Sequence, residues 1–163
     1  MTIYTDGSAH PNPGPGGFGL VVLNNNQELI EIHQKLYDCE VTNNEMELKA
    51  IIYATKHFGK TMFDFEEYEV PIVYSDSAYC VNTLTNWMYG WEERGWLKAD
   101  NKVPENLDLI KEYFELSKVS KINLQKCAGH SGNKWNDLAD ALATNKIGKK
   151  EEALIAEHYK KPL

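Results

Sequence analysis

The sequence contains no apolar run long enough to cross a bilayer, and its first residues lack the basic-then-apolar layout of a secretory signal. We therefore expect no membrane partner and a mature chain that starts near Met1. Cysteine is scarce: the three in the chain are widely spaced, and no two form a Cys-x-x-Cys pair. This pattern argues against a disulfide framework or a zinc site. It predicts a reducing, cytoplasmic compartment, with Cys80 and Cys127 as small buried hydrophobic residues.

Basic residues are also few, 17 against 24 acidic ones, and the formal net charge is -7. Non-specific affinity for nucleic acid comes largely from Lys and Arg at phosphates, so this balance taken alone counts against such a partner. It does not exclude one. A cluster of carboxylates that holds divalent cations would make a protein acidic for a different reason.

What the chain does contain is the pattern of a single α/β domain. Its 163 residues are enough for one substantial core. Alternating and apolar runs predict strands, and apolar residues at helical spacing predict helices, in the order β-β-β-α-β-α, a Trp-rich segment, then α-β-α. This order indicates a mixed sheet flanked by helices. The expected strands are 2–8, 18–23, 28–37, 70–75 and 121–127, and the expected helices follow residues 42–44, 76–77, 106 and 133.

Two segments interrupt the regular pattern. Residues 9–19, AHPNPGPGGFG, are so rich in Gly and Pro that we expect neither a helix nor a regular strand there. Residues 86–108 place Trp87, Trp91 and Trp96 among glycines and charged residues. They predict a protruding helix and loop whose aromatic rings pack on one another.

Three carboxylates occupy positions that invite a functional interpretation. Asp6 continues one face of the first strand, although Asp is disfavoured in strands. Glu47 falls within the apolar stripe of the first helix, and Asp76 follows a central strand, where open α/β sheets bind ligands. Each also has a purely structural interpretation, as an exposed strand-end residue, a capping carboxylate and a helix N-cap respectively.

The last predicted helix runs from a cap at Asn133 to Gly148. At about 100° per residue, Asp137 lies almost opposite its apolar stripe, whereas Asp140 lies on the flank of that stripe. Asp137 is therefore expected to face solvent, and Asp140 could reach a site at the edge of the sheet. Residues 148–163 are expected to form a short amphipathic helix or a frayed tail.

Four carboxylates gathered in one site would repel one another unless cations neutralised them. Ligand sets made only of oxygen select hard cations such as Mg²⁺ or Mn²⁺. Two such ions about 3.5–4 Å apart can activate a water and stabilise the leaving oxygen in phosphodiester cleavage. The spacing of Asp6, Glu47, Asp76 and Asp140 does not by itself establish that they converge.

An ordered set of short motifs runs through the chain. It consists of TDGS followed by NPGPGG, TNNEMEL, YSDS, W-x-x-x-W-x-x-RGW with a downstream PENLDL, and GHSGN with NDLADALA. Each is weak alone, but in this order and at these separations the sequence resembles type 1 ribonuclease H. The resemblance covers residues 1 to about 147. It implies one domain, 1–147, with a ribonuclease H-like fold, a five-stranded mixed sheet flanked by helices.

The resemblance also implies an activity: an endonuclease that hydrolyses the RNA strand of RNA–DNA hybrids, leaving 3′-hydroxyl and 5′-phosphate ends. Its metal ligands would be Asp6, Glu47, Asp76 and Asp140, holding two Mg²⁺ ions for which Mn²⁺ can substitute. The ending Asp-x-Leu-Ala of the family matches Asp140 rather than Asp137. His130 matches the loop histidine of the family, which is thought to assist proton transfer or product departure. We expect a monomer.

Hybrid recognition requires contacts to the 2′-hydroxyls that line a wide, shallow minor groove. The resemblance implies such contacts for three amides, a pocket for a DNA-strand phosphate, and a Trp-rich substrate-binding handle at about residues 86–108. These contacts position the substrate without reading bases, so cleavage should be largely independent of sequence. The residues concerned are Asn12, Asn43 and Asn44 for the RNA strand, Thr42 and Asn106 for the phosphate, and Trp87 and Trp91 in the handle.

The chain departs from the family pattern most clearly in the handle. That segment is usually strongly basic in the family, yet residues 92–105 hold three basic and four acidic side chains, a net charge of -1. Glu45 also stands where a non-acidic residue is common, and Ala78 where some members carry an amide. We therefore predict weak, salt-sensitive hybrid binding.

Two alternatives stay open at this stage. Another nuclease on the same scaffold, such as a junction resolvase or polynucleotidyl transferase, would act on all-DNA substrates. A hybrid-binding protein without catalysis would be unaffected in its activity by Asp6→Asn.

Overall fold

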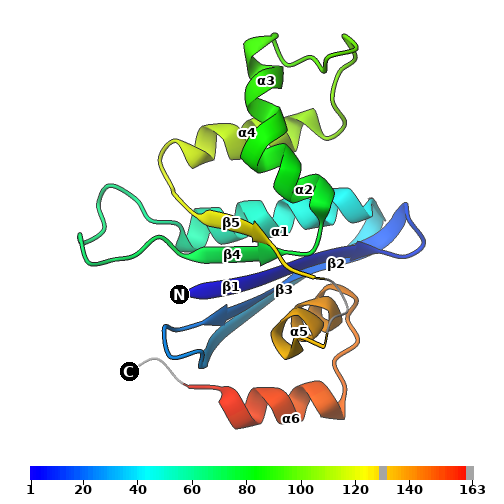
Figure 1. Cartoon of the computed structure of the whole chain (residues 1–163). Coiled ribbons are helices and arrows are strands. Elements are labelled where there is room, and N and C mark those ends of the chain that lie inside the picture. The colour runs from blue at the N-terminus through cyan, green and yellow to red at the C-terminus, as the bar shows by residue number, and fades with distance from the viewer. Residues whose placement is uncertain (129–131, 161–163) are drawn as a thin grey trace.

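The computed structural model describes residues 1–128 and 132–160. Its centre is a five-stranded mixed sheet in the order β3-β2-β1-β4-β5, with helices on both faces (Figure 1). The three amino-terminal strands form an antiparallel meander, and β4 and β5 add in parallel beside β1. This confirms the predicted fold class. The strands are β1 (Thr2–Ala9), β2 (Gly14–Leu23), β3 (Leu29–Val41), β4 (Ile72–Ser75) and β5 (Asn123–Lys126).

The Gly/Pro-rich run differs from the prediction. Strand β2 begins at Gly14, four residues earlier than expected, and Ser8 and Ala9 pair with Gly17 and Gly16. Most of the run expected to be irregular therefore belongs to the ladder. The physical reason lies in close packing: a Cβ at Gly19 would approach to 2.4 Å of the Leu142 Cβ. The glycines leave room for a helix to pack against the sheet, and they do not form a turn.

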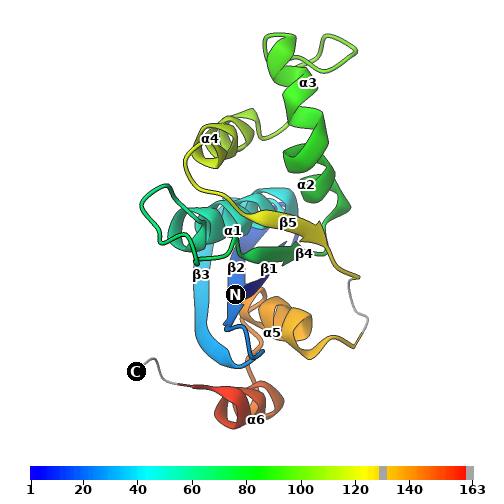
Figure 2. The same ribbon diagram turned by 60° about the vertical axis from the view of Figure 1, so that its left-hand side comes forward.

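Helix α1 (Asn43–Phe58) covers one face of the sheet, and α4 (Leu107–Ser117) packs against α1 on the same side (Figures 1 and 2). Thr42 and Asn44 are both plausible caps from the sequence, and the structure selects Thr42, whose hydroxyl accepts a hydrogen bond from the Glu45 amide at 3.1 Å. The core between helix and sheet includes Ile3, Leu48 and Ile51, each fully buried. This packing fixes which face of α1 looks toward the sheet.

The segment after β4 is one continuous helical rod that projects beyond the sheet (Figure 1). It consists of α2 (Ala78–Asn82), a π-helical turn η1 (Thr83–Trp87) and α3 (Met88–Glu93). The rings of Trp87 and Trp91 contact each other with centroids 6.4 Å apart. Trp96 instead packs edge-on against Phe114 of α4 at 5.2 Å. The aromatic side chains therefore pack partly on one another and partly on the neighbouring helix.

The opposite face of the sheet is covered by α5 (Lys134–Ala143). Asn133 caps this helix as predicted, accepting hydrogen bonds from the Trp135 and Asn136 amides at 3.0 and 3.2 Å. The predicted end at Gly148 is wrong, because α5 ends at Ala143 and Gly148 instead precedes a further helix.

That further helix is α6 (Lys149–His158), which lies within the stretch expected to form a short helix or a frayed tail. Leu154 and Ile155 pack against the cluster that contains Leu29 and Trp135. The Lys160 amide then donates to the Leu29 carbonyl at 2.7 Å. The tail is thus docked on the α5 side of the molecule.

Two smaller findings concern membrane-spanning helices and cysteines. No helix in the described ranges is long and apolar enough to traverse a bilayer. Cys80 is buried as predicted, whereas Cys127 is only half-buried, because β5 ends at Lys126 and the chain leaves the sheet there.

Candidate active site

Asp6 lies inside the sheet, on β1, with β2 on one side and β4 on the other. It pairs with Gly19 of β2, and its neighbour Thr5 pairs in parallel with Ser75 of β4. The carboxyl end of β4 therefore delivers Asp76 beside Asp6. Asp6 is 5% exposed, an unusual burial for a carboxylate on a strand.

Glu47 reaches the same place from α1. A Cβ at Gly7 would overlap the backbone of Met46 and Glu47, so the glycine after Asp6 is what allows α1 to lie this close to β1. Glu47 is 8% exposed, and among the described residues its Oε2 atom has no hydrogen-bond partner. A buried carboxylate oxygen without a hydrogen-bond partner indicates a binding site for a cation.

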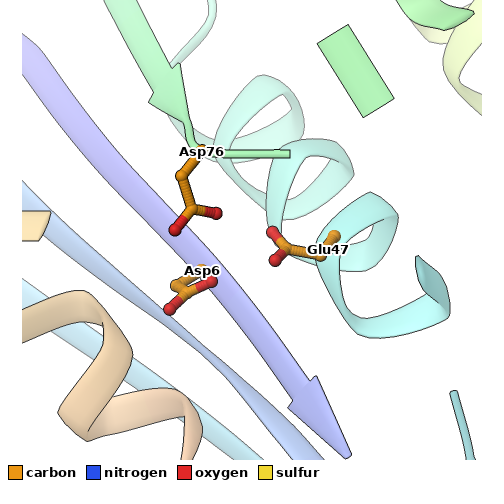
Figure 3. Close-up of side chains that lie close together, drawn as sticks. All are labelled: Asp6, Glu47 and Asp76. Atoms are coloured by element: carbon orange, nitrogen blue, oxygen red, sulfur yellow. The ribbon is translucent and has the colours of Figure 1, made fainter. Parts of the chain in front are cut away.

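Three carboxylates thus converge from β1, α1 and the end of β4. Asp6, Glu47 and Asp76 each offer an oxygen, and these oxygens lie within 4.8 Å of one another. Figure 3 shows their carboxyl groups pointing toward a common centre.

Without a cation, burial and mutual repulsion disfavour the ionised form of these carboxylates. Burial, followed by the charge of Asp76, raises the pKa of Asp6 to about 8. Burial, followed by the charge of Asp6, also raises the pKa of Glu47 well above its usual range. A site with these properties holds all its negative charges at neutral pH only when cations neutralise them.

The fourth predicted carboxylate comes from the opposite layer. Asp140, on α5, is half-buried and interacts with Asp6 by charge and by a side-chain hydrogen bond. Asp137 lies along a different part of α5, where it lines a hollow between α5 and α6. The structure therefore places Asp140, and not Asp137, at the edge of the carboxylate cluster.

The five polar residues predicted to hold the hybrid lie around one hollow of about 650 Å³. Within it, the Asn12 Oδ1 accepts from the Asn43 amide at 3.1 Å, and the Asn43 Oδ1 accepts from the Ala9 amide at 2.6 Å. Both amide oxygens are therefore used by the protein, which leaves the Nδ2 groups as donors for a ligand. The hollow is lined by Asn12, Pro13, Thr42, Asn43, Asn44, Glu105 and Asn106.

Glu105 is a lining residue that the motif comparison missed. It directly precedes Asn106, which has a left-handed backbone conformation with φ of 57° at the start of α4. The dipeptide was visible in PENLDL, but only the placement of α4 beside α1 shows that an acidic residue joins this hollow.

The two handle tryptophans lie on the rod, away from the carboxylates. Trp87 is exposed and Trp91 half-buried, and together with Arg94 they line a hollow of about 420 Å³. Arg94 was counted in the charge of the handle but not as a site residue. His130 lies outside the described residues.

Comparison with known proteins identifies the family. The sequence profile of the RNase H family matches residues 1–148. A ribonuclease H of Caldanaerobacter subterraneus subsp. tengcongensis is 40% identical over 150 residues, which cover 91% of this chain and 92% of that protein. A ribonuclease H of a Thermoanaerobacter species is 40% identical over 148 residues, 90% of this chain and 89% of that protein.

Solved structures share the fold. The crystal structure of LC11-RNase H1 in complex with an RNA/DNA hybrid superposes with a TM-score of 0.63 at 24% identity, covering 94% of this chain and 98% of that one. A foamy viral protease-reverse transcriptase in complex with RNA/DNA hybrid gives a TM-score of 0.73 at 19% identity, covering 89% of this chain but 19% of that much longer one.

The fold and the buried carboxylate cluster define a metal-dependent nuclease of the ribonuclease H class. The chain belongs to the ribonuclease H family. This confirms the family and the enzyme class predicted from the ordered motifs.

Proposed function

We propose that this protein is an endonuclease that hydrolyses the RNA strand of RNA–DNA hybrids, largely independently of sequence, leaving 3′-hydroxyl and 5′-phosphate ends. The observation that carries the proposal is the buried cluster of Asp6, Glu47 and Asp76, whose oxygens lie within 4.8 Å of one another. We further propose a monomeric, cytoplasmic enzyme whose catalytic domain spans residues 1–147.

The residues present fit divalent cations. The donor set is made only of carboxylate oxygen, which suits Mg²⁺ and allows Mn²⁺ to substitute. The unpartnered Glu47 Oε2 and the raised pKa of Asp6 are relieved by positive charge. Asp6, Glu47, Asp76 and Asp140 would hold two ions. When bound, these would lower the pKa of a water and stabilise charge on the phosphate.

The chain's own residues supply position and proton handling. Asp6, buried between two strands, has little freedom to move and would be a metal ligand held in a fixed place. Asn12, Asn43 and Asn44 would donate to the RNA strand, and Thr42 with Asn106 would hold a DNA phosphate. His130 would accept or return a proton during cleavage. Trp87 and Trp91 would contact the substrate further along the handle.

The test is gel-resolved cleavage of a labelled RNA–DNA hybrid with Mg²⁺, beside RNA–RNA and DNA–DNA duplexes of the same sequence. We expect cleavage confined to the RNA strand of the hybrid and none after chelation of the metal. Cleavage of the DNA duplex would support a different nuclease on this scaffold. An intact hybrid with both Mg²⁺ and Mn²⁺ would support a binding protein.

A substitution at Asn43 separates hydrogen-bond donation from local structure. Asn43→Asp keeps an oxygen for the Ala9 amide but removes the Nδ2 donors. We expect KM for the hybrid to rise about tenfold, the value of one to two lost hydrogen bonds, with the unfolding temperature unchanged. Because the added charge is screened and the lost donor is not, the defect should persist at high salt. A defect that disappears with salt would contradict the assigned donor role.

The acidic handle should limit affinity. Glu92→Lys/Glu93→Lys changes the net charge of residues 92–105 from -1 to +3. We expect hybrid binding to tighten about tenfold at low salt, and its salt dependence to steepen, because added cations displace more counterions from the duplex. Filter binding between low and moderate salt measures both. The matched control is Glu66→Lys/Glu67→Lys, which makes the same change of charge on the loop between α1 and β4. It should change hybrid affinity far less.

A further inference from the structure

The loop between α1 and β4 displays an unusual apolar patch. Met62, Phe63 and Phe65 are 86%, 90% and 83% exposed, the highest values among the large hydrophobic residues the structure describes. Single exposed apolar residues are common on protein surfaces. Three within four residues form a patch, and contiguous exposed patches mark interaction sites.

This loop is held in place by its own hydrogen bonds. The Asp64 carboxylate accepts from both the amide and the hydroxyl of Thr61, at 2.6 and 3.1 Å. The Tyr68 hydroxyl donates to the Phe58 carbonyl at 3.0 Å, and Lys60 pairs with Lys121 through the backbone. The aromatic side chains are thus presented from an ordered support, which reduces the entropy lost on binding.

The surroundings of the patch specify its ligand. Residues 60–70 contain four acidic side chains, all exposed, and one basic side chain, Lys60, whose Nζ donates to the Glu66 carbonyl at 3.5 Å. The formal net charge of this segment is therefore -3. This charge repels the phosphates of nucleic acid and of anionic lipid surfaces. It attracts a protein surface whose apolar cleft is bordered by Lys and Arg, the arrangement that speeds association and suppresses wrong partners.

The position of the loop leaves the active site free. It connects the carboxyl end of α1 to the amino end of β4, whereas Glu47 lies near the start of α1 and Asp76 follows the end of β4 (Figures 1 and 2). A partner bound here would lie at the opposite end of these two elements from the carboxylates.

We propose that the patch formed by Met62, Phe63 and Phe65 is a docking site for a protein with an apolar cleft bordered by basic residues. The aromatic rings enter the cleft, and the acidic side chains pair with its border. Docking tethers the nuclease without covering its active site. This inference does not depend on the proposed cleavage reaction.

The test places the photocrosslinking residue p-benzoylphenylalanine at position 63 of the full chain, produced in its native host. The control carries it at position 119, where Val119 is 66% exposed outside the patch. Proteins crosslinked only from position 63 are identified, purified and titrated against the wild-type protein. Two variants are compared: Phe63→Ser/Phe65→Ser, which removes the rings, and Glu66→Lys/Glu67→Lys, which reverses charge.

We expect one protein other than this chain to bind at least tenfold more weakly to the ring variant, and more weakly to the charge variant and at high salt. Hybrid cleavage and the unfolding temperature of the ring variant should equal those of the wild type, because the rings bury little surface. Several results would overturn the proposal: no adduct beyond those at position 119, adducts only with nucleic acid or a second copy of this chain, or binding insensitive to both variants.

Discussion

Asp6→Asn is expected to reduce cleavage of an RNA–DNA hybrid by at least about a thousandfold, equivalent to about 4 kcal/mol of transition-state stabilisation. Asp6 is the carboxylate that contacts the rest of the cluster, since it interacts with Glu47, Asp76 and Asp140. Replacing it removes a ligand from the centre of the site. Steady-state cleavage of a labelled hybrid with Mg²⁺ measures the loss.

The matched control for this prediction lies on α5. Asp140→Asn and Asp137→Asn make the same chemical change three residues apart on one helix. We expect Asp140→Asn to lose at least about a hundredfold in activity and Asp137→Asn to stay within about twofold of the wild type. Equal losses from both would place the fourth ligand elsewhere. Unchanged cleavage by Asp6→Asn would contradict the assignment of the carboxylate cluster as the catalytic site.

The second large effect concerns the stability of the metal-free protein. The folded state raises the pKa of Asp6 from 3.8 to about 8, so the native protein binds this proton more tightly than the unfolded chain does. The favourable contribution of the protonated group is complete below about pH 4. It is lost as pH rises toward about 8. We therefore expect the free energy of unfolding, without divalent metal, to fall across this window by about 1.4 kcal/mol per pH unit, the slope for one linked proton, and by about 5 kcal/mol in all.

A substitution and a metal ion should each reverse that loss of stability. Asp6→Asn removes the titrating group, so the metal-free variant should be more stable than the wild type at pH 8, by at least about 10 °C in unfolding temperature. Mg²⁺ at a hundredfold excess over its dissociation constant should stabilise the wild type by about 2.7 kcal/mol, and the variant much less. Thermal unfolding at pH 5 and pH 8, with EDTA or Mg²⁺, tests all four expectations. A wild type that is equally stable at both pH values in EDTA would contradict them.

Much of this protein was predictable from local patterns. The order of strands and helices, the cap at Asn133 and the inward face of Glu47 all follow from periodicity and capping. These signals involve only neighbours within one turn or one strand. The ordered motifs were sufficient for the family. Helical periodicity also separated Asp140 from Asp137, because both lie on one helix whose apolar stripe the sequence displays.

The errors fall where contacts join distant segments. The Gly-rich run was expected to be irregular because Gly and Pro disfavour strands locally. It pairs in β2 with β1 and β3, and its glycine at position 19 leaves the space in which α5 packs. The docking of α6 likewise depends on contacts with Leu29 and Trp135, which no local pattern displays. The early end of α5 is local instead, since Asn145 has a left-handed φ of 55° and the Lys146 amide donates to the Ala141 carbonyl at 2.8 Å.

The sequence by itself determined the elements, the family and which acidic residues were candidates. Only the tertiary structure decided that they meet. Parallel pairing of β1 with β4 sets Asp76 beside Asp6, and the missing side chain of Gly7 lets α1 bring in Glu47. Both depend on approach between segments some 40 to 70 residues apart in the sequence. Burial then gives the cluster its raised pKa and its demand for cations, because desolvation depends on everything packed around a carboxylate, not on its neighbours in the chain.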